Sequence, residues 1–140
     1  DTGFVQLVRH IAVNDSGEVI NPLLLAGQVH GGVAQGIGQA LLEDVTYDDQ
    51  GQILSGSFLD YTMPRADDLP MIETSDFVEA CQTNPLGVKG GGESGTVGSI
   101  PAAVNAVIDA LSEFGIKDIE MPVTPLKIWR AIHGEKQTNG

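Results

Sequence analysis

Cysteine is nearly absent from this sequence of 140 residues, in which Cys81 is the single example. One cysteine excludes a disulfide framework and a cluster of thiolate metal ligands. Histidine is sparse too: His10, His30 and His133 lie far apart, without a ligand spacing such as H-E-x-x-H. We therefore predict no metal ion held by the side chains of this chain alone, and we interpret each histidine as an ordinary surface or core residue.

Basic residues are also few, since 7 Lys and Arg stand against 19 Asp and Glu and give a net charge of −12. This balance argues against nucleic acid or an anionic membrane as partner, because both require clustered basic side chains. A bound phosphate would need backbone N–H groups instead. No apolar run approaches the roughly 18 residues of a membrane span, and no signal peptide opens the chain. We expect a soluble protein in a reducing compartment, the cytoplasm.

What is present suits a folded chain, with 41% hydrophobic and 19% charged residues. The length suits one domain or part of one, and the opening "DTGFVQLVRHIAVNDSGEVINP" reads as if cut from a longer polypeptide. Strand-like patterns cover residues 4–13, two runs within residues 47–64, and residues 75–83, where Asn84-Pro85 stops the last run.

Two helices carry clear signals. In "PAAVNAVIDALSEFG" the apolar spacing predicts one buried face, with Ser99 or Ile100 as cap, Pro101 in the first turn and Gly115 at the end. The predicted face consists of Val104, Val107, Ile108, Leu111 and Phe114. A shorter helix is predicted in "TPLKIWRAIH", capped by Thr124 with Pro125 at its first position. Strands packed with two main helices and a short C-terminal helix make an α+β fold.

The third helix, predicted over residues 25–43, is unusual in its glycines. Val29, Val33, Ile37 and Leu41 form an apolar stripe, and a second stripe is small: Gly27, Gly31, Ala34 and Gly38. Each interior glycine costs about 0.8–1.0 kcal/mol relative to alanine, so four of them cost roughly 3–4 kcal/mol. Another backbone packed against the small stripe would offset this cost, and so would a ligand lying along it. Both explanations stay open at this point.

The run from Gly87 to Gly98 has six glycines in twelve residues, with one carboxylate, Glu93, among them. Gly90, Gly92 and Gly95 match G-x-G-x-x-G, but a dinucleotide-binding turn needs a strand leading into its first glycine, and Asn84-Pro85 interrupts the preceding one. Glycines also let a backbone pass close to a bulky group, and a moderately buried carboxylate there could accept a proton. A solvated surface glutamate is the plain alternative.

Two long motifs carry a family resemblance. The segments "GEVINPLLLAGQVHGGVAQGIGQALLEDVTYDDQGQILSGSFLDYTMPRADDLP" and "NPLGVKGGGESGTVGSIPAAVNAVIDAL" resemble the C-terminal part of the molybdenum-binding large subunit of the xanthine dehydrogenase family. The aerobic carbon monoxide dehydrogenase type and its aldehyde and N-heterocycle hydroxylase relatives are the most similar. The likeness runs from about residue 3 to His133, so the resemblance implies that residues 1–140 are the C-terminal part of a molybdopterin-binding domain.

The resemblance implies roles for particular residues. The family's G-x-G-E loop falls on residues 90–93, so Glu93 matches the active-site glutamate beside molybdenum, which in most members takes the proton from the metal-bound hydroxyl. The family's G-Q-x-x-G-G helix falls on residues 27–32, so Gln28 matches the glutamine near the pterin. The expected cofactor contacts are Gln28, Gly31, Gly32, Gly92, Ser94 and Thr96. Gly91 and Ser94 depart from the usual family residues, which leaves the substrate open.

The resemblance also implies a cofactor and partners. These are a molybdenum–molybdopterin cofactor, in its cytosine dinucleotide form, with [2Fe-2S] and FAD on an iron–sulfur subunit and a flavin subunit. Other cofactor loops of the family are missing, so we expect a fragment or one piece of a split large subunit, inactive alone. Two alternatives remain: a non-catalytic fragment or paralogue that serves as an assembly surface, and a nicotinamide-binding half-domain.

Overall fold

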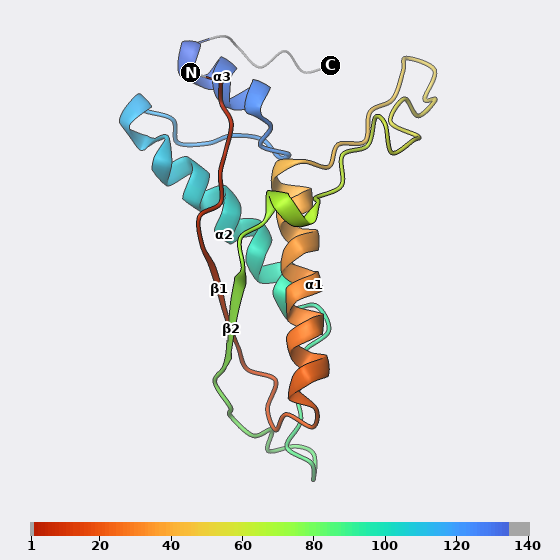
Figure 1. The fold of residues 1–140 in the computed structure, drawn as a ribbon, viewed down its shortest axis with the longest axis vertical. Coiled ribbons are helices and arrows are strands. Elements are labelled where there is room, and N and C mark those ends of the chain that lie inside the picture. The colour runs from red at the N-terminus through yellow and green to blue at the C-terminus, as the bar shows by residue number, and fades with distance from the viewer. Residues whose placement is uncertain (1, 135–140) are drawn as a thin grey trace.

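The computed structural model describes residues 2–134, which form three helices and one small sheet (Figure 1). Strand β1 (His10–Asn14) is followed by helix α1 (Pro22–Leu41), strand β2 (Ile72–Asp76), helix α2 (Ser94–Ala110) and helix α3 (Pro125–His133). Two single 3₁₀ turns, η1 (Ala66–Asp68) and η2 (Ser112–Phe114), complete the list of elements. The expected α+β fold, with two main helices and a short C-terminal one, is confirmed.

Helix α1 begins at a local capping signal. The Asn21 side chain accepts a hydrogen bond from the Leu24 N–H at 3.1 Å, and Pro22 occupies the first helical position. The helix therefore starts three residues before the predicted Leu25. The predicted apolar stripe is confirmed, since Val29, Val33, Ile37 and Leu41 are all buried in the core.

Helices α1 and α2 pack through glycines that we call the packed glycines: Gly32, Gly36 and Gly95. A Cβ atom on Gly36 would lie 2.8 Å from the Thr96 carbonyl oxygen, and one on Gly95 would lie 2.5 Å from the Val29 carbonyl oxygen. The two backbones are thus too close for any side chain at these points. Close helix packing therefore offsets part of the cost of the glycines, although through Gly32 and Gly36 rather than through the predicted small stripe.

The start of helix α2 corrects a prediction. The helix begins at Ser94, not near Pro101, and Ser99 and Ile100 lie inside it rather than at its cap. Burial of Gly95 and Ser99 against α1 stabilises these extra turns. Pro101 sits on the exposed side of the helix, where water can replace the hydrogen bond that its missing N–H would have made. At the other end, Phe114 is half exposed and not part of the buried face.

Helix α3 is confirmed as predicted, because its signals are local. The Thr124 hydroxyl accepts from the Lys127 N–H at 3.4 Å, Pro125 is the first residue, and Gly134 ends the helix with a φ of 73°. Ile128 of this helix joins the core beside Val123 and Ile119. Among residues 2–134, no helix is long and apolar enough to cross a membrane.

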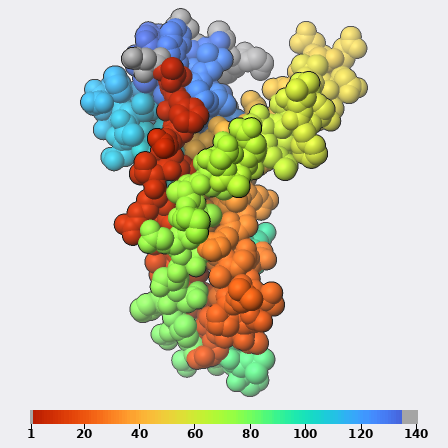
Figure 2. Space-filling view, in the orientation of Figure 1, coloured from red at the N-terminus to blue at the C-terminus, as the bar shows by residue number. Residues whose placement is uncertain are grey.

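The strands differ most from prediction. β1 and β2 pair in parallel, from His10 opposite Ile72 to Asn14 opposite Asp76, so the predicted strand over residues 4–13 pairs only at its end. The predicted strand over residues 75–83 overlaps β2 by two residues, because the chain turns away where β1 ends. Within residues 47–64 only one bridge forms, between Tyr47 and Ile53, and this segment projects from the body (Figure 2).

Candidate functional site

The helix motif and the glycine loop meet at one hydrogen bond. Gln28, exposed on the second turn of α1, donates from its Nε2 to the carbonyl oxygen of Gly92 at 2.7 Å. These residues lie 64 positions apart in the chain. The contact places residues 90–93, which we call the glycine loop, against the N-terminal half of α1. Two motifs that the sequence predicts separately therefore form one site.

Glu93 stands at the end of the glycine loop, immediately before the first helical residue of α2. It occupies the N-cap position, with φ −118° and ψ −1°, but its side chain makes no capping hydrogen bond. The residue is exposed in this chain, as in the solvated alternative that the sequence left open. Its carboxylate is free to meet a group outside the chain, beside the N-terminal N–H groups of a 17-residue helix.

Two predicted hydroxyl donors already have partners. Ser94 Oγ donates to the Gly91 carbonyl at 3.3 Å, and Thr96 Oγ1 donates to Gln35 Oε1 of α1 at 3.3 Å. Both contacts tie the start of α2 to the loop or to α1. Gly32 packs against Thr96 and Gly95, which gives it a structural role. The cofactor contacts expected for these residues stay a prediction.

Four glycines of these two motifs have open space where a side chain would lie, and we call them the open glycines: Gly27, Gly31, Gly90 and Gly92. A Cβ atom added to any of them would meet no heavy atom within 4 Å. All four residues are exposed and come from the two elements that Gln28 joins. An open, glycine-lined surface next to a carboxylate and a carboxamide fits the close approach of a bulky cofactor such as molybdopterin.

Gly91 differs from its neighbours in the loop because it faces inward. A Cβ atom there would lie 2.8 Å from Ser16 Oγ and 2.8 Å from Leu25 Cδ1. Ser16 is buried and its hydroxyl has no hydrogen-bond partner. The departure from the usual family residue at this position thus changes the packing beneath the loop, next to the start of α1.

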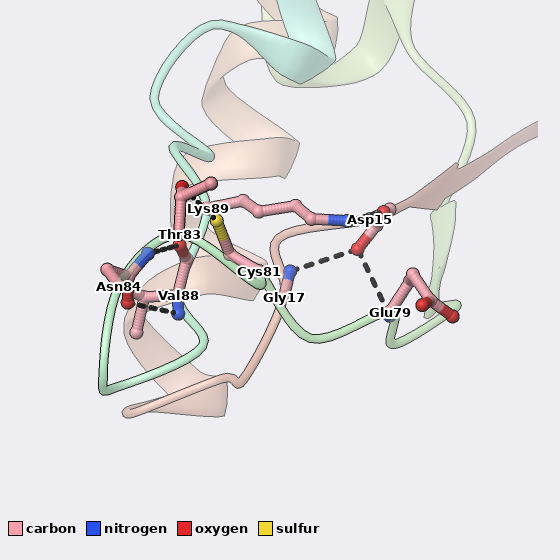
Figure 3. A network of polar contacts seen from close by, with 8 residues as sticks. All are labelled: Asp15, Gly17, Glu79, Cys81, Thr83, Asn84, Val88 and Lys89. Atoms are coloured by element: carbon pink, nitrogen blue, oxygen red, sulfur yellow. Dashed lines mark hydrogen bonds and ion pairs between the residues drawn. The ribbon is translucent and has the colours of Figure 1, made fainter.

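Sequence reasoning missed the polar contacts that hold the base of the glycine loop (Figure 3). Lys89 Nζ donates to Asp15 Oδ2 at 2.5 Å, joining the loop to the turn after β1. This hydrogen bond, followed by one from the Gly17 N–H, holds the pKa of Asp15 below its usual value. Asn84 is predicted from the sequence only to stop a strand, and nothing local in the sequence signals that Asp15 has a partner 74 positions away.

Two other chemistries find little support. In the part of the chain that the structure describes, no group of three or more His, Cys, Asp or Glu side chains could hold a metal ion. The residues before Gly90 form an isolated bridge between Gly17 and Val88 rather than a strand, so the setting of a dinucleotide-binding turn is not met there. What the site offers is a carboxylate, a carboxamide and bare backbone.

Comparison with known proteins gives consistent matches. A family model described as a molybdopterin cofactor-binding domain matches residues 1–70. The nicotine 6-hydroxylase large subunit of Paenarthrobacter nicotinovorans is 44% identical over 133 residues, which are 95% of this chain and 16% of that protein. The structure of CO dehydrogenase from Oligotropha carboxidovorans matches with a TM-score of 0.92 and 37% identity, covering 96% of this chain and 17% of the other.

A second solved structure gives a similar result. Quinoline 2-oxidoreductase from Pseudomonas putida 86 matches with a TM-score of 0.88 and 40% identity, over 91% of this chain and 16% of that chain. This chain thus spans about one sixth of the length of the relatives it matches.

Proposed function

Since this chain belongs to the molybdopterin cofactor-binding family of molybdenum oxidoreductases, we propose that it forms one wall of the active site of a larger molybdenum hydroxylase. The observation that supports this most directly is the hydrogen bond from Gln28 to Gly92. It joins the two motifs that match cofactor-facing segments of the family, beside an exposed Glu93.

The reaction proposed for the whole enzyme is oxidation with water as the oxygen source. The substrate is an electron-poor carbon in an aldehyde or N-heterocycle, or carbon monoxide. The relatives named for nicotine, quinoline and carbon monoxide support this range without selecting one member. When bound, the molybdenum–molybdopterin group, in its cytosine dinucleotide form, would supply the two-electron redox centre.

Glu93 is the residue proposed to carry the proton chemistry. An ionised carboxylate within hydrogen-bond reach of the reacting oxygen can accept the proton released as that oxygen transfers to the substrate. Glu93 suits this role because its side chain is exposed and makes no capping hydrogen bond that would hold it back. The three glycines before it, at positions 90–92, add no side chains of their own to the approach.

The remaining site residues are proposed to bind and orient the cofactor. The open glycines Gly31 and Gly92 would allow its close approach, and the Oε1 of Gln28 remains available as an acceptor while its Nε2 holds Gly92. Ser94 and Thr96 are proposed as further contacts at the start of α2, where each hydroxyl oxygen can accept and each hydrogen would donate to the cofactor only by leaving its present partner, Gly91 or Gln35. Gly32 would act beneath this surface by setting the distance between the two helices.

Other parts of the enzyme must complete the site. The chain matches only about 16–17% of the length of its relatives, so the other cofactor contacts and the rest of the substrate pocket are proposed to come from the remainder of the molybdenum subunit. Electrons would pass to [2Fe-2S] clusters and FAD on an iron–sulfur and a flavin subunit. The relatives named as large chains or subunits of complexes support this arrangement.

The test is Glu93→Gln in the complete enzyme. The amide keeps the size of the side chain but cannot accept the proton, so we expect turnover to fall by at least about 100-fold, in the range of losses that follow removal of a general base. Molybdenum per subunit, measured by mass spectrometry, should stay unchanged. Full activity of Glu93→Gln would contradict the proposal and would favour the alternative, in which this region is a non-catalytic assembly surface.

A further inference from the structure

The placement of Glu93 depends on how the ends of the glycine loop are held. Three successive glycines have more backbone freedom than any other three residues. Around two of them, Gly90 and Gly92, there is open space where a side chain would lie. Side-chain packing therefore fixes the loop only at Gly91. Its position comes mainly from contacts near its ends, the start of α2 and Gln28 on one side and Lys89 on the other.

Lys89 is anchored twice to the turn that follows β1. Its backbone N–H donates to the Ser16 carbonyl at 2.9 Å, and its Nζ donates to Asp15 Oδ2 at 2.5 Å. The other carboxylate oxygen of Asp15 accepts from the backbone N–H groups of Gly17 at 3.0 Å and Glu79 at 3.3 Å. One carboxylate thus joins three segments of the chain (Figure 3).

The segment that leads to Lys89 is itself closed by Asn84. Its Nδ2 donates to the Val88 carbonyl at 2.9 Å, and its Oδ1 accepts from the Val88 N–H at 3.3 Å. The Gly87 carbonyl accepts from the N–H groups of Glu18 at 3.0 Å and Cys81 at 2.8 Å. Residues 84–89 are therefore held together by their own hydrogen bonds. If the contact of Lys89 with Asp15 is lost, we expect the glycine loop after Lys89 to shift more than the turn before it.

The turn that holds Lys89 also leads into helix α1. Asp15 lies six residues before the helix cap Asn21, and α1 carries Gln28, which bonds the loop from its other side. The glycine loop and the start of α1 are therefore both connected to the turn that follows β1. Both side chains of the ion pair are about one third exposed, at 36% for Asp15 and 32% for Lys89, and such pairs contribute little to overall stability. A role in positioning explains them better.

We propose that Asp15 and Lys89 are positioning residues that fix the glycine loop, and with it Glu93, relative to the start of helix α1. This inference rests on the proposed function of Glu93. The pair acts through the backbone of residues 90–92 and does not touch the substrate. The hydrogen bond from Lys89 lowers the pKa of Asp15 below its ordinary value, as expected of a carboxylate paired with an ammonium group.

The experiment compares Lys89→Met, Lys89→Arg and a matched control in the complete enzyme. Lys89→Met should lower kcat by about 10- to 100-fold, since a misplacement of about 1 Å can have an effect of that size. KM and molybdenum per subunit should stay within about twofold of wild type. Lys89→Arg keeps a cation that can reach Asp15 and should recover most of the loss.

The control is Arg9→Met, which removes another ion pair between distant segments. Arg9 Nε contacts Glu73 Oε1 at 2.6 Å across the two strands, away from the loop, and its loss should leave kcat unchanged. A second readout is hydrogen exchange. The backbone amide of residue 89, which donates to the Ser16 carbonyl at 2.9 Å, should exchange faster in Lys89→Met and at the wild-type rate in Arg9→Met.

Three outcomes would overturn the inference: wild-type kcat in Lys89→Met, unchanged exchange of the residue 89 amide, or no recovery in Lys89→Arg. The double variant Lys89→Met with Glu93→Gln should be no slower than Glu93→Gln alone, because the pair acts through Glu93. If Glu93→Gln itself is fully active, the proposed function fails. If Glu93→Gln is inactive and Lys89→Met is normal, only the positioning inference fails.

Discussion

The packed and the open glycines make opposite use of the same residue type: the packed ones lie on α1 and α2, and the open ones lie on α1 and in the glycine loop. At Gly32, Gly36 and Gly95 the missing side chain lets two helix backbones touch, and an added carbon would meet backbone atoms at 2.5–3.0 Å. At the open glycines Gly27 and Gly31, less than two turns away, an added carbon would meet nothing. The first group is explained by this chain alone.

The open glycines are not explained by any contact within the chain. A glycine in an exposed helix interior lowers stability, so alanine would serve better at Gly31 unless something outside the chain approaches it. The contrast teaches that glycine content alone does not identify a site. The open glycines are not required by any contact within the chain, and they lie next to Gln28 and Glu93. This position supports the proposed cofactor contact.

The largest effect on the fold is expected from Gly95→Ala. Its new methyl carbon would lie 2.5 Å from the Val29 carbonyl oxygen and 3.0 Å from the Val33 nitrogen, both backbone atoms that cannot rotate away. We expect a loss of about 1–3 kcal/mol of unfolding free energy, as for other overpacked cores, measured by denaturant unfolding of the molybdenum subunit. Gly98→Ala, at an open position of the same helix, is the control. Equal stability of the two variants would contradict the packing role.

Gly31→Ala should separate stability from cofactor binding. The methyl group meets no atom of the chain, so the helix should gain about 0.5–1 kcal/mol of stability. If the cofactor lies against this face, molybdenum per subunit should nevertheless fall several-fold. Gly98→Ala should show a similar gain in stability with normal molybdenum content. Normal molybdenum in Gly31→Ala would show that the open glycines do not face the cofactor.

The smallest effect on stability is expected from Gln28→Ala, which removes the one hydrogen bond between the two motifs. Both partners are exposed, so water can replace the lost donor at Gly92. The unfolding free energy should therefore fall by about 0.5–1.5 kcal/mol at most. Turnover should fall by a larger factor than this change in free energy corresponds to, because the glycine loop loses the contact next to Glu93. Gln39→Ala, at another exposed glutamine of α1, should have no such effect.

Sequence reasoning succeeded where the signals were local. The cap Thr124 and first residue Pro125 of α3, and the apolar stripe of α1, depend on residues a few positions apart. It failed at the start of α2, because the packing of Gly95 and Ser99 against α1 outweighs the helix-breaking tendency of the glycines and of Pro101. The strand boundaries were missed for a related reason: the register between β1 and β2 selects which residues pair.

The site was predicted as residues but not as an arrangement. The family motifs named Gln28 and Glu93, yet no spacing rule connects Gln28 to Gly92 or Asp15 to Lys89. The sequence left open whether Glu93 is buried or solvated, since burial depends on which segments surround a side chain. Sequence patterns report neighbours along the chain, whereas these contacts join segments that the fold brings together.

The contacts at the site share one property, a long separation in the chain: 61 positions between Gln35 and Thr96, 64 between Gln28 and Gly92, and 74 between Asp15 and Lys89. The entropy lost in closing such loops rises only with the logarithm of their length, and once one pair has formed the others span much shorter effective loops. These contacts are therefore expected to form together rather than one after another. A newly made chain would then acquire the proposed cofactor-facing surface in one step rather than residue by residue.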